Sequence, residues 1–570
     1  MATTRKHENV YEIPEGHFDL PEGYVGNLTD DQQTKLRQLW EGFFDVLSKA
    51  RGNAAGAAAG QEEFNSDPKK ANIPKGDEAK DLKKAEDERK AMNDLLNEYG
   101  ADVVRDKAWR FVAADHPDTG MLRFLRARKW DVDRALAMLA ATMKWRLDTK
   151  VDDIAEAGDE GNQHIEKFLD QQNSGKVYAM ASSKTLQPIV YIHVKKHFTR
   201  GQPSQSMQKF ILSSLETDRL LMVPPNDKVV LLFDMKGFGI SNMDFGSILY
   251  VLKCLEAYYP ESLGFLAIHR APFIFSGFWQ ILKPLLDPVV RAKVGFTQKT
   301  KDLEDRIPVD RLVPSVEGEM ITEFDFVPPQ AGENKLHQDE EGRKREKGKY
   351  MDLAQQYEDA TREWINTDLK DQKILDKRAL LAKKLRIQQY AMEPYFRGKT
   401  VLHRDGTIDG TGRVTWFYKQ KDGRTQKHVL GRKYCVPTLK REVKEIEEEG
   451  VSVKDAEART DKALEAKDWV ALYGSKKVAK DYEGRLRGVA GDPEEVEDMD
   501  DDVAAPTTGT VGAPVVESAD KGNVTASDEF HEAPEASARQ IRKADGEATL
   551  GDKIKGPLET GMEKVKDALP

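Results

Sequence analysis

The sequence predicts an α/β protein in which a mixed, largely parallel sheet is covered by helices. Residues 176–297 alternate short, nearly continuous apolar runs with stretches of helical period. Such runs are typical of parallel strands that helices bury on both faces. Residues 103–149 show only helical periodicity, and the chain turns strongly charged after residue 330. We therefore expect a small helical lobe, an α/β domain, a helical extension and a disordered tail, in that order.

The composition narrows the class of protein. The 570 residues allow three or four segments, and an apolar content of 39% supports a real core. Two distant cysteines, Cys254 and Cys435, exclude a disulfide framework and suit a reducing compartment. The net charge of −10 argues against nucleic-acid binding, and no apolar run is long enough to span a bilayer. Because the N-terminus also lacks a secretory signal, we expect a cytoplasmic protein.

The first expected element is an amphipathic helix within an N-terminal extension, residues 1–50. Thr29 and Gln32 are spaced to form a capping box. The apolar residues behind them share one helical face: Leu36, Leu39, Trp40, Phe43, Phe44 and Leu47. The Gly- and Ala-rich stretch that follows predicts a flexible linker over residues 51–86.

Residues 87–165 are expected to form the helical lobe, and residues 166–330 the α/β domain. In the lobe, Asp131 is a predicted N-cap, behind which Leu136 and Leu139 recur at helical spacing. Five runs in the α/β domain predict strands: 176–182, 188–194, 228–235, 264–270 and 294–297. Helical stretches at 205–222 and 242–259 separate them.

The last two segments are charged. Residues 331–475 predict a helical extension, with a helical pattern over 349–392 and a β-hairpin over 413–430. Residues 476–570 are acidic and rich in Ala, Pro, Thr and Gly, which predicts a disordered tail.

No catalytic motif is present, so we do not expect an enzyme. The G-x-G in KGFGISN has Asn242 in place of the third glycine of a dinucleotide fingerprint, and no P-loop or G-x-S-x-G elbow occurs. His193 and His197 lie at the end of a predicted strand, where residues four apart do not form a ligand face. Residues 405–412 lack the ligands of a calcium loop and predict a turn. We therefore expect no metal site.

The stretch FIFSGFWQILKPLL, residues 273–286, is unusually apolar for so charged a chain. On a helix, only Ser276, Gln280 and Lys283 form a polar stripe. Such a helix is either buried nearly all round or lies between two apolar environments. Gly277 and Pro284 allow breaks near its ends, which is compatible with a hinged lid.

Three longer motifs carry a resemblance to a known family. They are MLRFLRARKWDV at 121–132, LLFDMKGFGISNMD at 231–244 and LEAYYPESLGFLAIHRAPFIFSGFWQILKPLLDPVVRAK at 255–293. In order and spacing they resemble the CRAL-TRIO lipid-transfer family over roughly residues 100–320. The N-terminal GNLTDDQQTKLRQLW and the long C-terminal extension are most similar to the Csr branch of fungal phosphatidylinositol transfer proteins.

The resemblance implies an enclosed apolar cavity with a mobile gate helix and a headgroup site. The implied gate residues are Phe273, Phe275, Phe278, Trp279, Ile281 and Leu282. The implied headgroup residues are Arg128, Lys129, Glu261 and Lys293. Val290 stands where the family has a threonine, which removes one hydroxyl from the site. Cations would neutralise the phosphate, and Glu261 would accept hydrogen bonds from inositol hydroxyls.

The family's choline-lipid site is altered in this chain. Its strand hydroxyls correspond to Val229 and Leu231, which share one strand face with Phe233. A phosphocholine group buried on this wall would lose its partners, so the wall favours an apolar second ligand such as squalene or a sterol. Tyr191 and His193 point the same way on a predicted strand, but we expect them to be packed core residues and expect no haem or other cofactor.

The expected function is binding of phosphatidylinositol and its transfer between membranes. The protein would act in the cytoplasm, touch membrane surfaces transiently, and present lipid to a lipid kinase or another protein partner through its C-terminal region. Two alternatives remain open: a lipid-sensing scaffold or regulator, and a carrier of a neutral lipid without phosphatidylinositol. A carrier moves labelled lipid between vesicles, whereas a sensor binds lipid and hardly releases it.

Overall fold

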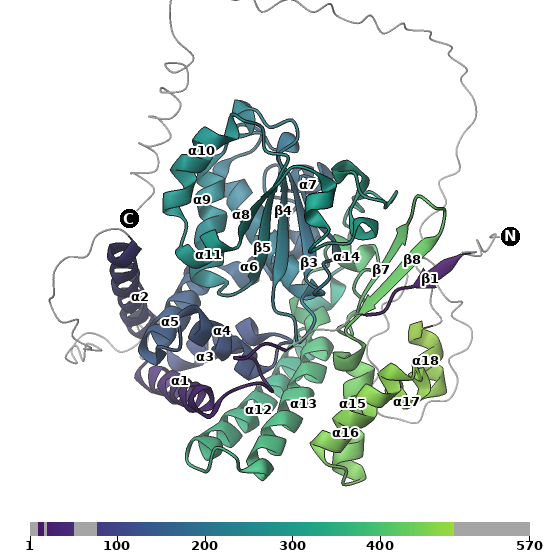
Figure 1. The fold of residues 1–570 in the computed structure, drawn as a ribbon. Helices are drawn as coiled ribbons and strands as arrows, with labels where there is room; N and C mark the ends of the chain where they lie inside the picture. Colours follow the sequence, from purple (N-terminus) through teal and green to yellow (C-terminus); the bar gives the residue numbers. More distant parts are fainter. Residues whose placement is uncertain (1–8, 16–19, 51–76, 484–570) are drawn as a thin grey trace, which may run out of the picture. The chain divides into compact units, whose positions relative to one another are not determined.

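A computed structural model describes residues 9–15, 20–50 and 77–483 (Figure 1). Most of the expected linker and nearly all of the expected tail lie outside the described residues. In the part of the chain that the structure describes, no helix combines the length and the hydropathy needed to cross a membrane.

The central sheet has five strands in the order β2-β3-β4-β5-β6. Strand β2 pairs antiparallel with β3, and the other neighbours are parallel. All five strands lie where the sequence predicts them: β2 Val177–Ser182, β3 Pro188–His193, β4 Val229–Asp234, β5 Leu263–His269 and β6 Val294–Thr297. The prediction of a mixed, largely parallel sheet is therefore confirmed.

Helical crossovers join the parallel strands. They are α8 Ser204–Asp218, α9 Phe245–Lys253, and the pair α10 Phe275–Leu282 and α11 Pro288–Ala292. Because right-handed crossovers between strands taken in this order fall on the same side, these helices cover one face of the sheet (Figure 1). On the other face, Val230 and Leu232 pack in a core with Leu303, Leu312 and Trp416.

The N-terminal lobe is helical, as predicted. Its helices are α3 Ala101–Val112, α4 Pro117–Ala127, α5 Val132–Thr149, α6 Val151–Asn162 and α7 Phe168–Asn173. Asp131 caps α5 by accepting from the Arg134 backbone N–H, as expected.

The linker prediction is wrong at its C-terminal end, because helix α2 spans Asp77–Glu98. Its first turns have no apolar stripe, so the sequence pattern does not predict them as helix. Ion pairs to other elements hold them instead: Asp81 pairs with Arg134 at 2.6 Å, and Lys84 pairs with Glu256 at 3.1 Å.

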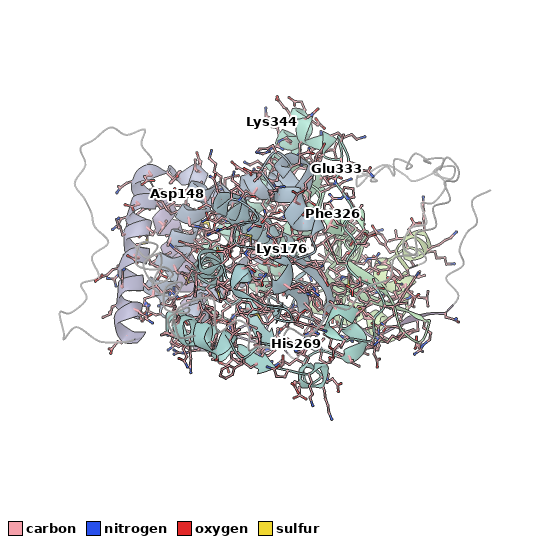
Figure 2. All side chains as sticks on the ribbon, turned by 90° about the horizontal axis from the view of Figure 1, so that it is seen from above. Asp148, Lys176, His269, Phe326, Glu333 and Lys344 are labelled. Atoms are coloured by element: carbon pink, nitrogen blue, oxygen red, sulfur yellow. The ribbon has the colours of Figure 1, made fainter. Side chains whose placement is uncertain are left out.

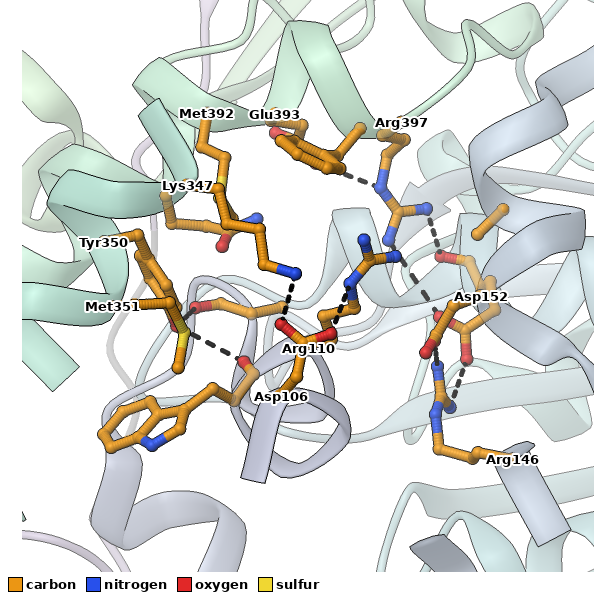
Figure 3. Close-up of a pocket in the computed structure, with 16 residues that line it drawn as sticks. Asp106, Arg110, Arg146, Asp152, Lys347, Tyr350, Met351, Met392, Glu393 and Arg397 are labelled. Atoms are coloured by element: carbon orange, nitrogen blue, oxygen red, sulfur yellow. Dashed lines mark hydrogen bonds and ion pairs between the residues drawn. The ribbon is translucent and has the colours of Figure 1, made fainter. Parts of the chain in front are cut away.

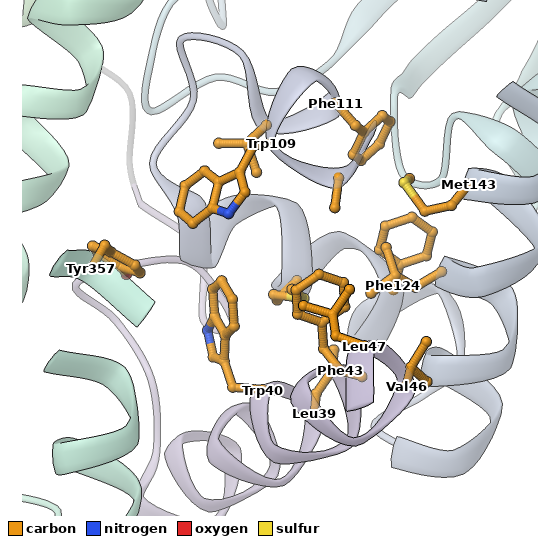
Figure 4. Packing of buried hydrophobic residues seen from close by; sticks show 14 of the residues in the cluster. Leu39, Trp40, Phe43, Val46, Leu47, Trp109, Phe111, Phe124, Met143 and Tyr357 are labelled. Atoms are coloured by element: carbon orange, nitrogen blue, oxygen red, sulfur yellow. The ribbon is translucent and has the colours of Figure 1, made fainter. Parts of the chain in front are cut away.

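The N- and C-terminal extensions share one core with this lobe. Helix α1 Asp30–Lys49 begins with the predicted Thr29–Gln32 capping box. It packs against the lobe and against α12 Glu340–Ile365, as Figure 4 shows around Trp40, Trp109 and Tyr357. Helix α13 Gln372–Phe396 completes the cluster. The two extensions are therefore parts of one compact unit, which corrects the separate segments expected from composition.

A buried polar network fastens these helices together. The Asp118 carboxylate accepts from Trp40 Nε1 at 2.8 Å, Tyr357 Oη at 3.0 Å and Arg378 Nη2 at 2.7 Å. Burial alone would raise the pKa of Asp118, but the charges of Arg378 and His116 and the hydrogen bonds from Arg378 and Trp40 together lower it. Asp118 is therefore the ionised partner of a buried pair that joins α4 to α13.

The C-terminal extension contains the predicted hairpin. Its strands are β7 Val414–Lys419 and β8 Thr425–Leu430, and β1 Val10–Glu12 adds to β8 in parallel. The remaining helices are α14 Val401–Arg404, α15 Val436–Glu448, α16 Val453–Glu465, α17 Trp469–Tyr473 and α18 Lys476–Glu483.

Helix α18 corrects the expectation that disorder begins at residue 476. Its last residue, Glu483, pairs with Arg432 at 2.8 Å and with Arg413 at 3.1 Å, and both guanidinium groups are buried. Tyr473 also donates to Glu483, at 2.6 Å. These contacts anchor a short charged helix that composition alone marks as solvated. The tail expected beyond it lies outside the described residues.

Candidate functional site

Three charged side chains meet at one edge of the central sheet. Lys228, Glu261 and Lys293 precede β4, β5 and β6, whose amino ends lie together because these strands are parallel. The Glu261 carboxylate lies 3.5 Å from Lys293 Nζ and 3.8 Å from Lys228 Nζ. All three side chains are about one-fifth exposed. The structure thus joins two implied headgroup residues and adds Lys228, which the sequence did not single out.

The N-terminal extension contributes Tyr24 to this edge. Lys228 Nζ donates to the Tyr24 hydroxyl at 2.8 Å, and that hydroxyl donates to Asp227 at 3.1 Å. Arg126 lies over the Tyr24 ring and pairs with Asp227 at 2.5 Å. Burial, and next the negative charge of Asp227, raise the pKa of Tyr24, so Tyr24 stays a neutral donor. Tyr24 and Arg126 therefore position Lys228.

The other two implied headgroup residues, Arg128 and Lys129, are not part of this cluster of ion pairs. Arg128, at the end of α4, forms a buried ion pair with Glu88 of α2. Lys129 follows in a left-handed conformation with φ 51° and an exposed side chain. A lipid phosphate that approaches Arg128 would therefore compete with Glu88 for the guanidinium.

The apolar stretch at residues 273–286 contains α10, and the faces of this helix differ in burial. Phe275, Phe278 and Leu282 are buried, and Trp279 and Ile281 are half-buried. The predicted polar stripe of Ser276, Gln280 and Lys283 is exposed. Phe273, expected within the helix, precedes it and is 94% exposed. Pro284 lies in a short 3₁₀ turn, so the helix breaks there as the sequence suggested.

The strand wall faces this helix layer. Phe233 is paired in register with Ile268, which is paired with Phe296, so the three residues share a face. The Phe296 ring packs edge-on against Trp279 of α10 at 5.1 Å. By alternation along β4, Val229 and Leu231 lie on the same face as Phe233. They are buried and bring no hydroxyl to it.

Helix α9 is the least completely packed part of this layer. Its residues FGSILYVLK are mostly apolar, but none of its side chains is fully buried. Near its start, Phe245 contacts Phe278 of α10 at 6.0 Å, and Phe278 also contacts Phe238 at 5.9 Å. The helix layer thus leaves apolar surface accessible beside an apolar wall.

Tyr191 and His193 belong to the opposite face of the sheet. The His193 ring lies 3.0 Å from the Tyr178 hydroxyl and 3.2 Å from Asp234, and Tyr191 donates to the Arg311 carbonyl at 3.2 Å. Both residues are buried and hydrogen-bonded within the protein. Among the described residues, no group of three or more His, Cys, Asp or Glu side chains could hold a metal ion.

A small crevice between the lobe and α13 is filled by ion pairs (Figure 3). Arg146 bridges Glu216 at 2.8 Å and Asp152 at 2.5 Å, and Arg397 approaches Glu216 at 4.0 Å. Its volume is only about 60 Å³, which leaves room for little more than water. These residues join elements and do not form a ligand site.

Comparison with known proteins defines the family. The CRAL/TRIO domain matches residues 172–318, and the CRAL/TRIO N-terminal domain matches residues 80–141. The chain belongs to the CRAL/TRIO family, which confirms the resemblance found in the sequence.

Three relatives illustrate how far the similarity extends. Phosphatidylinositol transfer protein CSR1 of Eremothecium gossypii is 31% identical over 427 residues, covering 68% of this chain and 98% of that protein. A CRAL-TRIO domain-containing protein of Schizosaccharomyces pombe is 29% identical, covering 68% of this chain and 93% of that protein. SEC14 cytosolic factor of Eremothecium gossypii is 30% identical, covering 34% of this chain and 67% of that protein. The first two matches extend well beyond the two family domains.

Proposed function

We propose that this protein binds phosphatidylinositol and transfers it between membranes without covalent chemistry. The observation that carries the proposal is the Lys228–Glu261–Lys293 cluster at the edge of a sheet whose helix-covered face is apolar. A polar headgroup and two acyl chains need such a pairing of environments. The name of the 31% identical relative, a phosphatidylinositol transfer protein, supports the same ligand.

The cationic and anionic side chains of the cluster would bind different parts of the headgroup. The ammonium groups of Lys228 and Lys293 would neutralise the phosphate by charge-assisted hydrogen bonds. The Glu261 carboxylate, which only accepts hydrogen bonds, would take inositol hydroxyls as donors. In the ligand-free cluster these groups neutralise one another at 3.5 and 3.8 Å, so the site would exchange internal ion pairs for lipid contacts.

The acyl chains would occupy the space between the β4 wall and α9 and α10. Val229, Leu231 and Phe233 would supply the wall, and α9 would add apolar side chains that are not fully buried. Each CH₂ transferred from water contributes about 0.8 kcal/mol, so a cavity of this composition would hold a lipid outside the membrane. Exchange then requires α10 to move when the protein meets a bilayer.

Exposed apolar residues on three loops mark the expected membrane-facing surface. Phe198, Ile240 and Phe273 follow the carboxyl ends of β3, β4 and β5, and each is more than half exposed. Thr199 donates to the Ser241 and Met243 carbonyls, which ties the first two loops together. Phe238 of the second loop packs against Phe275 and Phe278 of α10. Membrane contact at the loops would therefore be transmitted directly to the gate.

The direct test is transfer of labelled phosphatidylinositol between vesicles by wild type and by the double variant Glu261→Ala/Lys293→Ala. We expect the variant to lose transfer and co-purifying phosphatidylinositol while keeping its helical signal and melting transition. The matched control is Lys377→Ala/Glu363→Ala, which removes an exposed ion pair of 2.9 Å on α12 and α13. Unchanged transfer by the first variant would refute the headgroup assignment, and binding without transfer by wild type would favour a lipid sensor.

A neutral hydrophobic ligand is a second candidate, favoured by the absence of hydroxyls on Val229 and Leu231. Replacing them in the double variant Val229→Ser/Leu231→Thr should lower the occupancy of a squalene- or sterol-like lipid and raise that of phosphatidylcholine, because the new hydroxyls would serve the phosphocholine group. Mass spectrometry of the lipids that co-purify with each protein measures both changes. If neither lipid's occupancy changes, this wall does not select the ligand.

A further inference from the structure

A second cavity lies at the other end of the sheet from the Glu261 cluster. It is bounded by edge strand β2, helix α8, residues 322–327, α14 and β7, and its volume is about 360 Å³. That size falls within the range of small-molecule sites. Phe326, one of its lining residues, is labelled in Figure 2. Nothing in the proposed lipid site uses this cavity.

One face of helix α8 lines the cavity and is mostly polar. The lining residues recur at helical spacing: Phe210, Ser213, Ser214, Thr217 and Asp218. Ser214 donates its hydroxyl proton to the Phe210 carbonyl at 3.0 Å, so its oxygen remains free to accept. The helix buries its apolar residues Met207, Ile211 and Leu212 elsewhere, so the groups that it presents to the cavity are mostly hydrogen-bonding ones.

Asp218 is the unusual member of the stripe. It is only 8% exposed, and within the described residues its carboxyl has no hydrogen-bond donor and no cation in contact. Burial raises the pKa of Asp218 from its ordinary 3.8 to about 7. A buried carboxyl without a partner is costly, and buried acids are normally paired or hydrogen-bonded.

The other acidic groups of the cavity are already engaged or lie at its rim. Asp159 pairs with Arg404 at 2.6 Å, and Asp405 accepts from the Thr407 backbone N–H at 2.8 Å. Glu323 and Asp325 are exposed. None of the described residues that line the cavity is a lysine, arginine or histidine. Asp218 is therefore the buried acidic group of this lining that has no donor or cation in contact among the described residues.

Aromatic rings form the opposite wall. Phe324 stacks on Tyr178 with ring centroids 4.7 Å apart, and Phe326 and Trp416 also line the cavity. Aromatic faces and a carboxylate are the two groups that recognise an organic ammonium ion. We propose that this cavity is a binding site for a small organic amine, whose ammonium group pairs with Asp218 and whose apolar body lies on the aromatic wall. Ser214 and Thr217 would accept its remaining N–H bonds.

The test is calorimetric titration of the full-length protein with n-hexylamine, and with 1-hexanol as the uncharged analogue of the same length. We expect wild type to bind n-hexylamine, and Asp218→Asn to weaken that binding by at least about tenfold, the value of one charge-assisted hydrogen bond. Binding of 1-hexanol should be weak and equal in the two proteins. The matched control is Glu323→Gln, which removes an exposed rim charge.

A second variant tests the site even if Asp218→Asn fails to fold. Ser214→Leu leaves the carboxylate in place but fills the cavity, so it should also abolish n-hexylamine binding while phosphatidylinositol transfer stays at the wild-type rate. The proposal is overturned if wild type does not bind n-hexylamine, if 1-hexanol binds equally well, or if Asp218→Asn binds n-hexylamine like wild type. Because transfer is measured separately, these outcomes leave the proposed lipid function untouched.

Discussion

At the scale of single residues, the carboxyl groups of Glu261 and Asp218 lie in opposite environments. Glu261 lies between two lysines and keeps partial access to solvent. Asp218 is buried beside a cavity without a cation. In the proposed site the first arrangement would supply charges to a lipid headgroup, whereas the charge of the second carboxyl is relieved by protonation or by an added cation. The burial of Asp218 therefore has a consequence for how stability depends on pH.

Asp218→Asn should stabilise the ligand-free protein at pH 8. The pKa of Asp218 is about 7 in the folded protein and 3.8 in the unfolded chain. Its carboxyl therefore costs no stability below pH 4, costs more as pH rises from 4 to 7, and costs the full amount above 7. Three pKa units correspond to a difference on the order of 4 kcal/mol, an upper value because the new amide is also buried. Urea unfolding of both proteins between pH 4 and 8 measures this.

The informative quantity is the difference between the two proteins at each pH. It should be near zero at pH 4 and grow toward pH 8, whatever the other titrating groups contribute to both. A constant difference across this range would show that burial does not raise the pKa of Asp218 in the folded protein.

The sequence predicts some residues of the Lys228–Glu261–Lys293 cluster and misses others for a physical reason. Glu261 and Lys293 lie in family motifs and are found 3.5 Å apart. Lys228 and Tyr24 lie in no motif, and a contact between residues so distant in the chain leaves no local pattern. The partner of Arg128 is equally unpredictable, because Glu88 is one charged residue among many on a helix without an apolar stripe.

At the scale of elements, the phenylalanines of α10 are buried, whereas the one in the loop before it is exposed. Phe275 and Phe278 are buried against Phe238, whereas Phe273 precedes the helix with almost its whole ring in solvent. An exposed phenylalanine contributes little to stability but much to insertion into a lipid surface. Packing and the proposed membrane contact are therefore separable by mutation.

Phe273→Ser should reduce association with anionic vesicles and slow phosphatidylinositol transfer, because it removes the most exposed apolar side chain of the three loops. The free energy of unfolding should change by less than about 0.5 kcal/mol. Vesicle co-sedimentation and urea unfolding provide the two readouts. Ile321→Ser, which removes a half-exposed apolar residue elsewhere, is the control and should leave both unchanged. Equal effects of the two substitutions would argue against a specific membrane-facing loop.

The elements that the sequence predicts well are those with an apolar period. All five strands of the sheet, the α1 capping box and the β7–β8 hairpin fall at their expected positions. The start of α2 and helix α18 were missed because ion pairs, not apolar stripes, hold them. Strand β1 was missed because three residues are too few to show alternation.

At the scale of the whole molecule, the two extensions complete a core that the lobe begins. The apolar period of residues 349–392 predicts a helix, but no sequence pattern shows that its partner is α1 and α4 at the other end of the chain. Asp118 and Arg378 form the polar centre of this assembly. The C-terminal extension is therefore a structural part of the fold, independently of any partner that it binds.

Arg378→Ala should destabilise the protein by about 3–5 kcal/mol, because it leaves the buried Asp118 carboxylate without its cation. Urea unfolding followed by tryptophan fluorescence reports on this directly, since Trp40 donates to the same carboxylate. The neighbouring Lys377→Ala removes an exposed cation and should cost less than about 1 kcal/mol. If the two variants were equally stable, the Asp118–Arg378 pair would not join the extension to the lobe.

The shared core also has a consequence for synthesis. Helices α1 to α5 leave the ribosome early, but α12, which covers them, begins only at Glu340. At about 5–20 residues per second, the interval between Thr149 and Glu340 lasts roughly 10–40 s. During that time the nascent lobe presents Trp40 and Trp109 without their partner Tyr357. Each newly made molecule thus depends on shielding of its first core until more than half of the chain has been translated.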